Sequence, residues 1–230
     1  MRAKSASAFA GCGIAALVAS TLLSGGCLTS RLEELKNSAT GIAAGESLVI
    51  LATSYHKGQT VEEGFVSCVR DEVSSGKGAL PVYSEQQFAD DLFPWFEPRT
   101  APQAASALPA LLARPGVKER IQARGVRYLV WLNGSTERVN SGGTMSCAIG
   151  VGIAGCLGLG WWEDESKYDA AVWDLSTRTD AGTVSANVQG TSMVPAIVVP
   201  IPIIARTKAA ACKDIARQIA TFIRNPGPAA

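Results

Sequence analysis

The chain is poor in the residues on which most metal and catalytic sites depend. Its 230 residues contain a single histidine, and aromatic residues make up only 7% of them. With one imidazole and no recurring spacing of carboxylates, the sequence predicts no metal site and no bound cofactor. Lysine and arginine together number 21 and aspartate and glutamate 20, so no excess of charge points to a nucleic acid as partner.

A long apolar run is also lacking. The uncharged segment near the amino terminus, Ala8–Leu23, is shorter than the roughly 18 to 20 residues that a membrane-spanning helix needs. It follows Arg2 and Lys4 and leads into small residues at positions 24–26. A basic start, an apolar middle and a small-residue end are typical of a secretory signal peptide, so we expect residues 1–26 to direct export and to be removed.

The next residue, Cys27, is a candidate lipid acceptor. The segment from Leu23 to Cys27 resembles the lipobox of bacterial lipoproteins, with Ser24 standing where that motif has leucine. An ordinary signal-peptidase site would fit the same small residues and stays open as the alternative. In a Gram-negative cell the resemblance, with Leu28 after the cysteine, implies a lipid anchor in the outer membrane and a protein that faces the periplasm.

Four cysteines remain once Cys12 leaves with the signal and Cys27 carries lipid, an even number for an oxidising compartment. Cys147 and Cys156 bracket a short glycine-rich loop, so we predict a disulfide between them. Cys68 and Cys212 are then left for each other. Each lies on the apolar stripe of a predicted helix, and two helices packed on one face of a sheet would bring them within bonding reach. Four free or buried thiols are the alternative.

Short apolar runs alternate with helical stripes through residues 46–225. We predict strands at Leu48–Thr53 and Val126–Leu132, and a hairpin of Tyr168–Leu175 with Thr183–Thr191. Capping residues and apolar spacing predict helices that begin at Thr60 and after Ser84, and others over 117–124 and 208–224. This order predicts a single α/β (α+β) domain, in which helices cover a mixed sheet of about four or five strands and the last helix packs on the sheet.

The segments outside this pattern are expected to be less regular. Residues 27–45 have few aromatics and one modest helical patch, and are interpreted as a tether between lipid and domain. Prolines at 195, 200 and 202 place Val194–Ala205 at a sheet edge or in a loop. Residues 226–230 form a tail.

The order of elements, with Trp173-Asp174-Leu175 in a hairpin before a final cysteine-bearing helix, resembles that of a group of envelope lipoproteins. The group includes the curli secretion lipoprotein, the amino-terminal domain of the TolB translocation protein and the lipoprotein activators of penicillin-binding proteins. The resemblance implies a non-catalytic accessory that binds another envelope protein or assists its assembly. The chain departs from the group in its cysteine-bracketed loop and its proline-rich segment, so no residue role transfers.

The segment Gly142–Trp162 is the most unusual in composition, because it carries no charge and ends in Trp161 and Trp162. Within it, residues 150–155 match the dinucleotide fingerprint GxGxxG, but no helix-forming sequence follows to hold a pyrophosphate, so we predict a hairpin tip. A flexible apolar surface that ends in aromatic rings is typical of contact with a membrane interface or a protein partner. The alternative is that both tryptophans fill core space.

Two further functions stay open. A periplasmic hydrolase or glycan-binding enzyme would use His56, or Asp90 and Asp91 near Trp95 and Phe96, because aromatic rings stack on sugars and paired carboxylates hydrolyse them. Trp95 and Phe96 are also candidates for contact with a partner or membrane. A subunit of an oligomeric membrane pore would insert the glycine-rich hairpin. We favour the binding accessory, since no serine lies in a nucleophile elbow.

Overall fold

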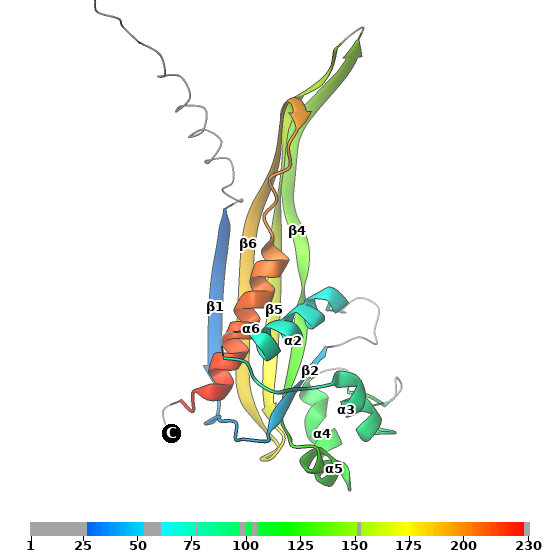
Figure 1. Cartoon of the computed structure of the whole chain (residues 1–230), viewed down its shortest axis with the longest axis vertical. Helices are drawn as coiled ribbons and strands as arrows, with labels where there is room; N and C mark the ends of the chain where they lie inside the picture. Colours follow the sequence, from blue (N-terminus) through cyan, green and yellow to red (C-terminus); the bar gives the residue numbers. More distant parts are fainter. Residues whose placement is uncertain are drawn as a thin grey trace, which may run out of the picture.

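The computed structural model describes residues 27–52, 61–76, 78–96, 100–102, 105–150 and 153–227. It contains one six-stranded mixed sheet with helices on both faces, which confirms the predicted α/β class with one or two strands more than expected (Figure 1). The spatial order is β1-β6-β5-β4-β2-β3. Strand β2 pairs in parallel with β3 and β4, and the remaining pairs are antiparallel. The strands are β1 (Leu28–Lys36), β2 (Ser47–Ala52), β3 (Val82–Tyr83), β4 (Val126–Gly150), β5 (Ile153–Asp174) and β6 (Thr179–Pro200).

The helices are short apart from two. They are α2 (Glu63–Ser75), α3 (Glu85–Asp91), α4 (Leu108–Leu112), α5 (Val117–Ala123) and α6 (Thr207–Arg224), with a 3₁₀ turn at Ala105–Ala107. The predicted cap of α3 is present, because the Ser84 hydroxyl accepts a hydrogen bond from the Gln87 backbone N–H at 3.5 Å. Helix α2 begins later than predicted, with Glu62 at its cap, and Thr60 lies outside the described residues. In the described part of residues 100–115, only α4 and the 3₁₀ turn are helical.

Helices α2 and α6 cover one face of the sheet, where the larger core lies (Figure 1). The apolar stripes of both helices meet alternate residues of the central strands, such as Ile50, Val130 and Val172. A disulfide joins Cys68 of α2 to Cys212 of α6, with a Cα–Cα distance of 6.3 Å, so this predicted pairing is confirmed. The covalent bond fixes the two helices that together close this face.

A second core lies on the opposite face, under α3, α4 and α5. It contains the residues of β2 and β4 that alternate with those of the first core, among them Val49, Leu51 and Leu129. Both faces of β2 are therefore buried, which explains why its sequence reads as a continuous apolar run rather than an alternating one.

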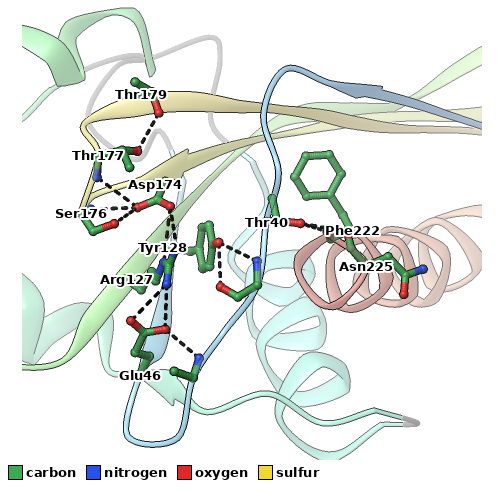
Figure 2. A network of polar contacts seen from close by, with 12 residues as sticks. Thr40, Glu46, Arg127, Tyr128, Asp174, Ser176, Thr177, Thr179, Phe222 and Asn225 are labelled. Carbon is green, nitrogen blue, oxygen red and sulfur yellow. Dashed lines mark hydrogen bonds and ion pairs between the residues drawn. The ribbon is translucent and has the colours of Figure 1, made fainter. Parts of the chain in front are cut away.

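The segment expected to be a tether is instead ordered against the sheet. Residues 28–36 form β1, an edge strand paired with β6 over its whole length, from Leu28 opposite Gly190 to Lys36 opposite Gly182. The prediction failed because a polar segment with few aromatics suggests a solvated linker, whereas charged side chains are also typical of an exposed edge strand. The chain is then held down again where the Thr40 hydroxyl donates to the Phe222 carbonyl at 2.6 Å (Figure 2).

A polar network ties the end of β1 and the start of β2 to the lower end of the sheet (Figure 2). The Tyr128 hydroxyl donates to the carbonyl of Gly41 at 2.8 Å. Beside it the Arg127 guanidinium lies 3.2 Å from the Asp174 carboxylate and 3.3 Å from that of Glu46. Burial raises the pKa of the Tyr128 hydroxyl, which keeps it a neutral donor. These contacts fix the segment between β1 and β2 against the rest of the domain.

Strands β4, β5 and β6 continue far beyond the helices, and this extension was not predicted. The sequence indicated a strand over residues 126–132, yet β4 runs on for eighteen more residues. Beyond Gly190, strand β6 has no partner in β1, so the proline-containing segment lies at a sheet edge, as predicted. This part of β4 could not be recognised as a strand, because its glycines and polar residues lack the apolar alternation that is typical of a half-buried strand.

Candidate functional site: an uncharged ribbon

The extension is a three-stranded ribbon that projects away from the helices (Figure 1). We call residues 139–150 of β4, 153–162 of β5 and 191–200 of β6 the ribbon. No lysine, arginine, aspartate or glutamate occurs in residues 139–162 or 181–205. The described part of the ribbon therefore carries no formal charge, although most of its residues are exposed.

One face of the ribbon is an apolar stripe. Residues directly opposite each other in a sheet share a face, and the register pairs Leu157 with Ile197, Leu159 with Pro195 and Trp161 with Met193. Leu157 is 71% exposed and Ile197 80%. These six residues, which we call the apolar face, lie on the side of the sheet opposite α6. An exposed stripe of this kind is uncommon on a soluble surface and marks a site of contact.

Charged residues return abruptly at the base of the ribbon. Arg138 forms an ion pair with Asp164 at 3.2 Å, and the Trp162 indole N–H donates to the same carboxylate at 3.0 Å. The Arg138 guanidinium lies 5.1 Å from the centroid of the Trp162 ring. This places an aromatic ring and fixed charges together where the apolar surface ends, an arrangement typical of a membrane–water boundary.

The next polar cluster down the sheet is centred on Glu165. Its carboxylate accepts hydrogen bonds from Gln189 at 2.9 Å and Asn187 at 3.0 Å, and Lys167 lies 2.8 Å away. The hydrogen bond from Lys167 and those from the two amides lower the pKa of Glu165 to about 2. The Glu165 carboxylate, next to the base of the ribbon, is therefore ionised at neutral pH.

Cys27 lies beside this base. The carbonyl oxygen of Cys27 accepts a hydrogen bond from the backbone N–H of Thr191, and Leu28 is opposite Gly190. Gly190 is in turn opposite Asp164 in β5, and Asp164 opposite Arg138 in β4. The candidate lipid acceptor therefore lies at the same level of the sheet as the charged residues where the ribbon begins. Its thiol is free and exposed.

The tip of the ribbon is closed by the second predicted disulfide. Cys147 and Cys156 are opposite each other in β4 and β5, with a Cα–Cα distance of 4.0 Å, which confirms the pairing. The glycine motif at residues 150–155 lies at this hairpin tip with no helix after it, as expected. Residues 151 and 152 are outside the described part.

The structure separates the other candidate residues from the ribbon. Phe96 packs edge-on against Phe88, with ring centroids 5.3 Å apart, and Trp95 lies 5.1 Å from the Arg120 guanidinium. Asp91 pairs with Arg124 at 2.6 Å and accepts from the Tyr83 hydroxyl at 2.8 Å. Asp90 is exposed, and His56 lies outside the described residues. Trp161 and Trp162 are both partly exposed and on opposite faces of β5, so neither fills the core of the domain.

The sequence predicted the hairpin tip of the ribbon, but neither the length of its first two strands nor its third strand. The apolar segment after Thr191 pairs with β5 and completes the apolar face. The available signal was the absence of charge from 181 through 205, which matches that of 139–162. In the described residues no group of three or more His, Cys, Asp and Glu side chains could hold a metal ion, and no helix is long and apolar enough to cross a membrane.

Comparisons with known proteins do not assign the chain to a family. No protein-family profile matches the sequence, and no curated protein is significantly similar to it. Among solved structures, a PelC dodecamer from Paraburkholderia phytofirmans aligns with 86% of this chain and 99% of its own, at 12% identity and a TM-score of 0.38. A single-substitution variant of the same protein aligns with 86% and 100%, at 12% identity and a TM-score of 0.40. A likeness this slight carries no functional meaning.

Proposed function

We propose that the chain is a lipid-anchored envelope protein, a non-catalytic binding or assembly accessory, whose ribbon contacts the membrane that holds its lipid. The observation that carries this is the position of Cys27 at the base of the ribbon. Since β1 is paired from Leu28 onward, no flexible linker separates a lipid on Cys27 from the sheet. The membrane surface would then meet the protein where Arg138, Asp164 and Trp162 lie.

The dimensions of the ribbon support the same proposal. From Thr191 to Val198 the paired part of β6 extends eight residues past the anchor, or roughly 26 Å at the rise of a β-strand. That is close to the thickness of a bilayer's hydrocarbon core, about 30 Å. The apolar face would enter the membrane or lie along its surface, while the ionised cluster at Glu165 stays in water.

The lipid that a lipobox cysteine acquires has at least two acyl chains, which is enough for stable anchoring. In this proposal the ribbon adds an independent contact with the membrane. The test compares three variants of the full chain in cells: Cys27→Ala, the pair Leu157→Asp with Leu159→Asp, and all three together. We expect little release from washed membranes for the ribbon pair alone, partial release for Cys27→Ala, and full release only for the triple variant.

A matched control is Leu35→Asp, which places a charge on an exposed leucine of β1 at the far end from Cys27. It should leave membrane association at the wild-type level, alone or with Cys27→Ala. The proposal is wrong if the two ribbon charges add nothing to the release caused by Cys27→Ala. Circular dichroism of the purified variants checks that each retains the fold.

The pore subunit is a second candidate, favoured by the free outer edge of β4 in the ribbon. Among the described residues, β4 has no partner on that edge beyond Leu132, whereas the outer edge of β6 is bridged by Ile203 at Met193 and bonded by Ile201 at Pro195. Unpaired backbone groups cost several kcal/mol each in hydrocarbon, so a ribbon that enters the bilayer core would pair its edges with neighbouring copies. A monomer in detergent extracts, measured by light scattering, would contradict this candidate. The apolar face would then lie along the membrane surface.

A further inference from the structure

The order of the parallel strands creates a crevice at the carboxyl end of β2, far from the ribbon. From β2 the chain passes through α2 to β3 on one side, and from β3 it passes through α3, α4 and α5 to β4 on the other side of β2. Helix α2 packs on one face of the sheet and α3 to α5 on the opposite face. Ligands of open α/β sheets bind outside the carboxyl ends of strands at such a switch point.

A cavity of about 640 Å³ lies at this point. Its floor contains Leu51 and Ala52, the last two residues of β2, and its wall includes the rings of Tyr83, Phe96 and Trp131. The volume falls within the range of small-molecule sites, which are mostly apolar with a few fixed polar groups. Aromatic faces in such a wall can stack on a flat apolar surface of a ligand.

The polar part of the cavity centres on Arg70 of α2. One terminal nitrogen of its guanidinium pairs with the Glu85 carboxylate at 2.8 Å. Its Nε is buried and has no hydrogen-bond partner among the described residues. Because Nε is closed off from solvent, a ligand in the cavity reaches the other atoms of this cluster, in which the Arg70 and Glu85 side chains are 34% and 39% exposed. Asp71 and Gln86 line the same cavity and are exposed at its mouth.

The charges of the lining side chains select among ligands. Among the described lining residues Arg70 is positive, while Glu85 and Asp71 are negative, so these side chains together do not favour an anion. Carboxylate, amide and guanidinium groups beside aromatic rings suit a ligand with many hydroxyl groups and an apolar ring face. A neutral sugar ring has both.

We propose that this crevice binds a neutral saccharide, with its ring against Phe96 and its hydroxyl groups facing the polar side chains of Arg70, Asp71 and Glu85. The site is separate from the ribbon. The saccharide proposal therefore goes beyond the membrane-contact function and does not depend on it. It also differs from a hydrolase using Asp90 and Asp91, because neither of those carboxylates lines the cavity.

The test measures binding of neutral trisaccharides of glucose, galactose, mannose and N-acetylglucosamine to the purified mature chain. Calorimetric titration should give a dissociation constant below about 10 mM for at least one of them. Phe96→Ala should weaken that binding at least tenfold, which corresponds to about 1.4 kcal/mol. The matched control is Trp95→Ala, which removes the neighbouring ring that does not line the cavity.

A second pair of variants tests the polar side. Asp71→Ala should weaken saccharide binding, whereas Asp90→Ala, which also removes an exposed carboxylate, should leave it unchanged. The proposal is overturned if none of the four sugars binds, or if Trp95→Ala weakens binding as much as Phe96→Ala. It is also overturned if spermidine binds in an Asp71-dependent way and no sugar does, because the crevice would then be a cation site.

Discussion

Cys27 is hydrogen-bonded to Thr191: its carbonyl oxygen lies 3.4 Å from the Thr191 backbone nitrogen. This contact joins the first described residue of the chain to the first ribbon residue of β6. A lipid on Cys27 and the uncharged ribbon therefore start from one place on the sheet. The pairing of β1 with β6 keeps the lipid and the ribbon together. The proposed function therefore depends on the strength of this pairing, which can be measured.

Replacing Gly190 should weaken the pairing next to Cys27. A Cβ at this position would lie 2.7 Å from Leu28 Cδ2 and 2.8 Å from Ala205 Cβ. Such crowding costs about 1–3 kcal/mol in a packed site, so Gly190→Val should expose the start of β1 to hydrogen exchange. Gly160→Ala is the control, because a Cβ there meets nothing within 4 Å. Equal protection of β1 amides in both variants would contradict the expectation.

The two disulfides should contribute unequally to stability. Cys68–Cys212 closes a loop with a sequence separation of 144, and Cys147–Cys156 one of 9. Chain entropy predicts a larger effect for the longer loop, about 5 against about 2.6 kcal/mol, before native-state strain is subtracted. Denaturant unfolding of the Cys68→Ser/Cys212→Ser and Cys147→Ser/Cys156→Ser variants measures both losses. An equal or larger loss from the tip pair would contradict the ranking.

The core of the domain could be predicted from the sequence because its signals are local. Helix α6 shows an apolar stripe that includes Cys212, and β2 is a continuous apolar run, so both were recognised. The Cys68–Cys212 pairing followed from the apolar stripes of two helices, and the Cys147–Cys156 pairing from the short glycine-rich loop that these cysteines bracket. What defines the site is not local, since β1 becomes a strand only by pairing with the inner part of β6, and the outer part of β6 only by pairing with β5. Polar, glycine-containing and proline-containing strands carry no apolar alternation to reveal that pairing.

The crevice at the end of β2 could not be found from sequence for a related reason. Phe96 was recognised as a candidate beside Asp90 and Asp91, which are near it in the chain. In the fold it lies instead with Arg70 and Trp131, which come from other elements. Only the crossing of the chain from one face of the sheet to the other brings these side chains together.

The network at the lower end of the sheet should be important for stability. Arg127 is shared between Glu46 and Asp174, and the Asp174 side chain is only 5% exposed. Arg127→Met would leave that carboxylate without its cation, at a cost of about 2 kcal/mol for a partly buried pair. Arg31→Met is the control, because its ion pair with Glu33 is exposed and worth at most about 1 kcal/mol. Thermal or denaturant unfolding compares them, and equal losses would contradict the ranking.

Acid should destabilise the protein partly through Glu165. Its pKa is held at about 2 in the folded chain, below the ordinary value of 4.5, by Lys167, Gln189 and Asn187. A carboxylate with a lowered folded pKa stabilises the fold fully above its unfolded pKa, and that contribution is lost as the pH falls from about 4.5 towards 2. Glu165→Gln should therefore lose stability less steeply than the wild type over this interval. Lys167→Met removes the largest cause of the lowered pKa, so in this variant the loss should be smaller and should end at a higher pH. Denaturant unfolding at a series of pH values measures all three chains, and identical profiles for wild type and Glu165→Gln would show that Glu165 does not contribute.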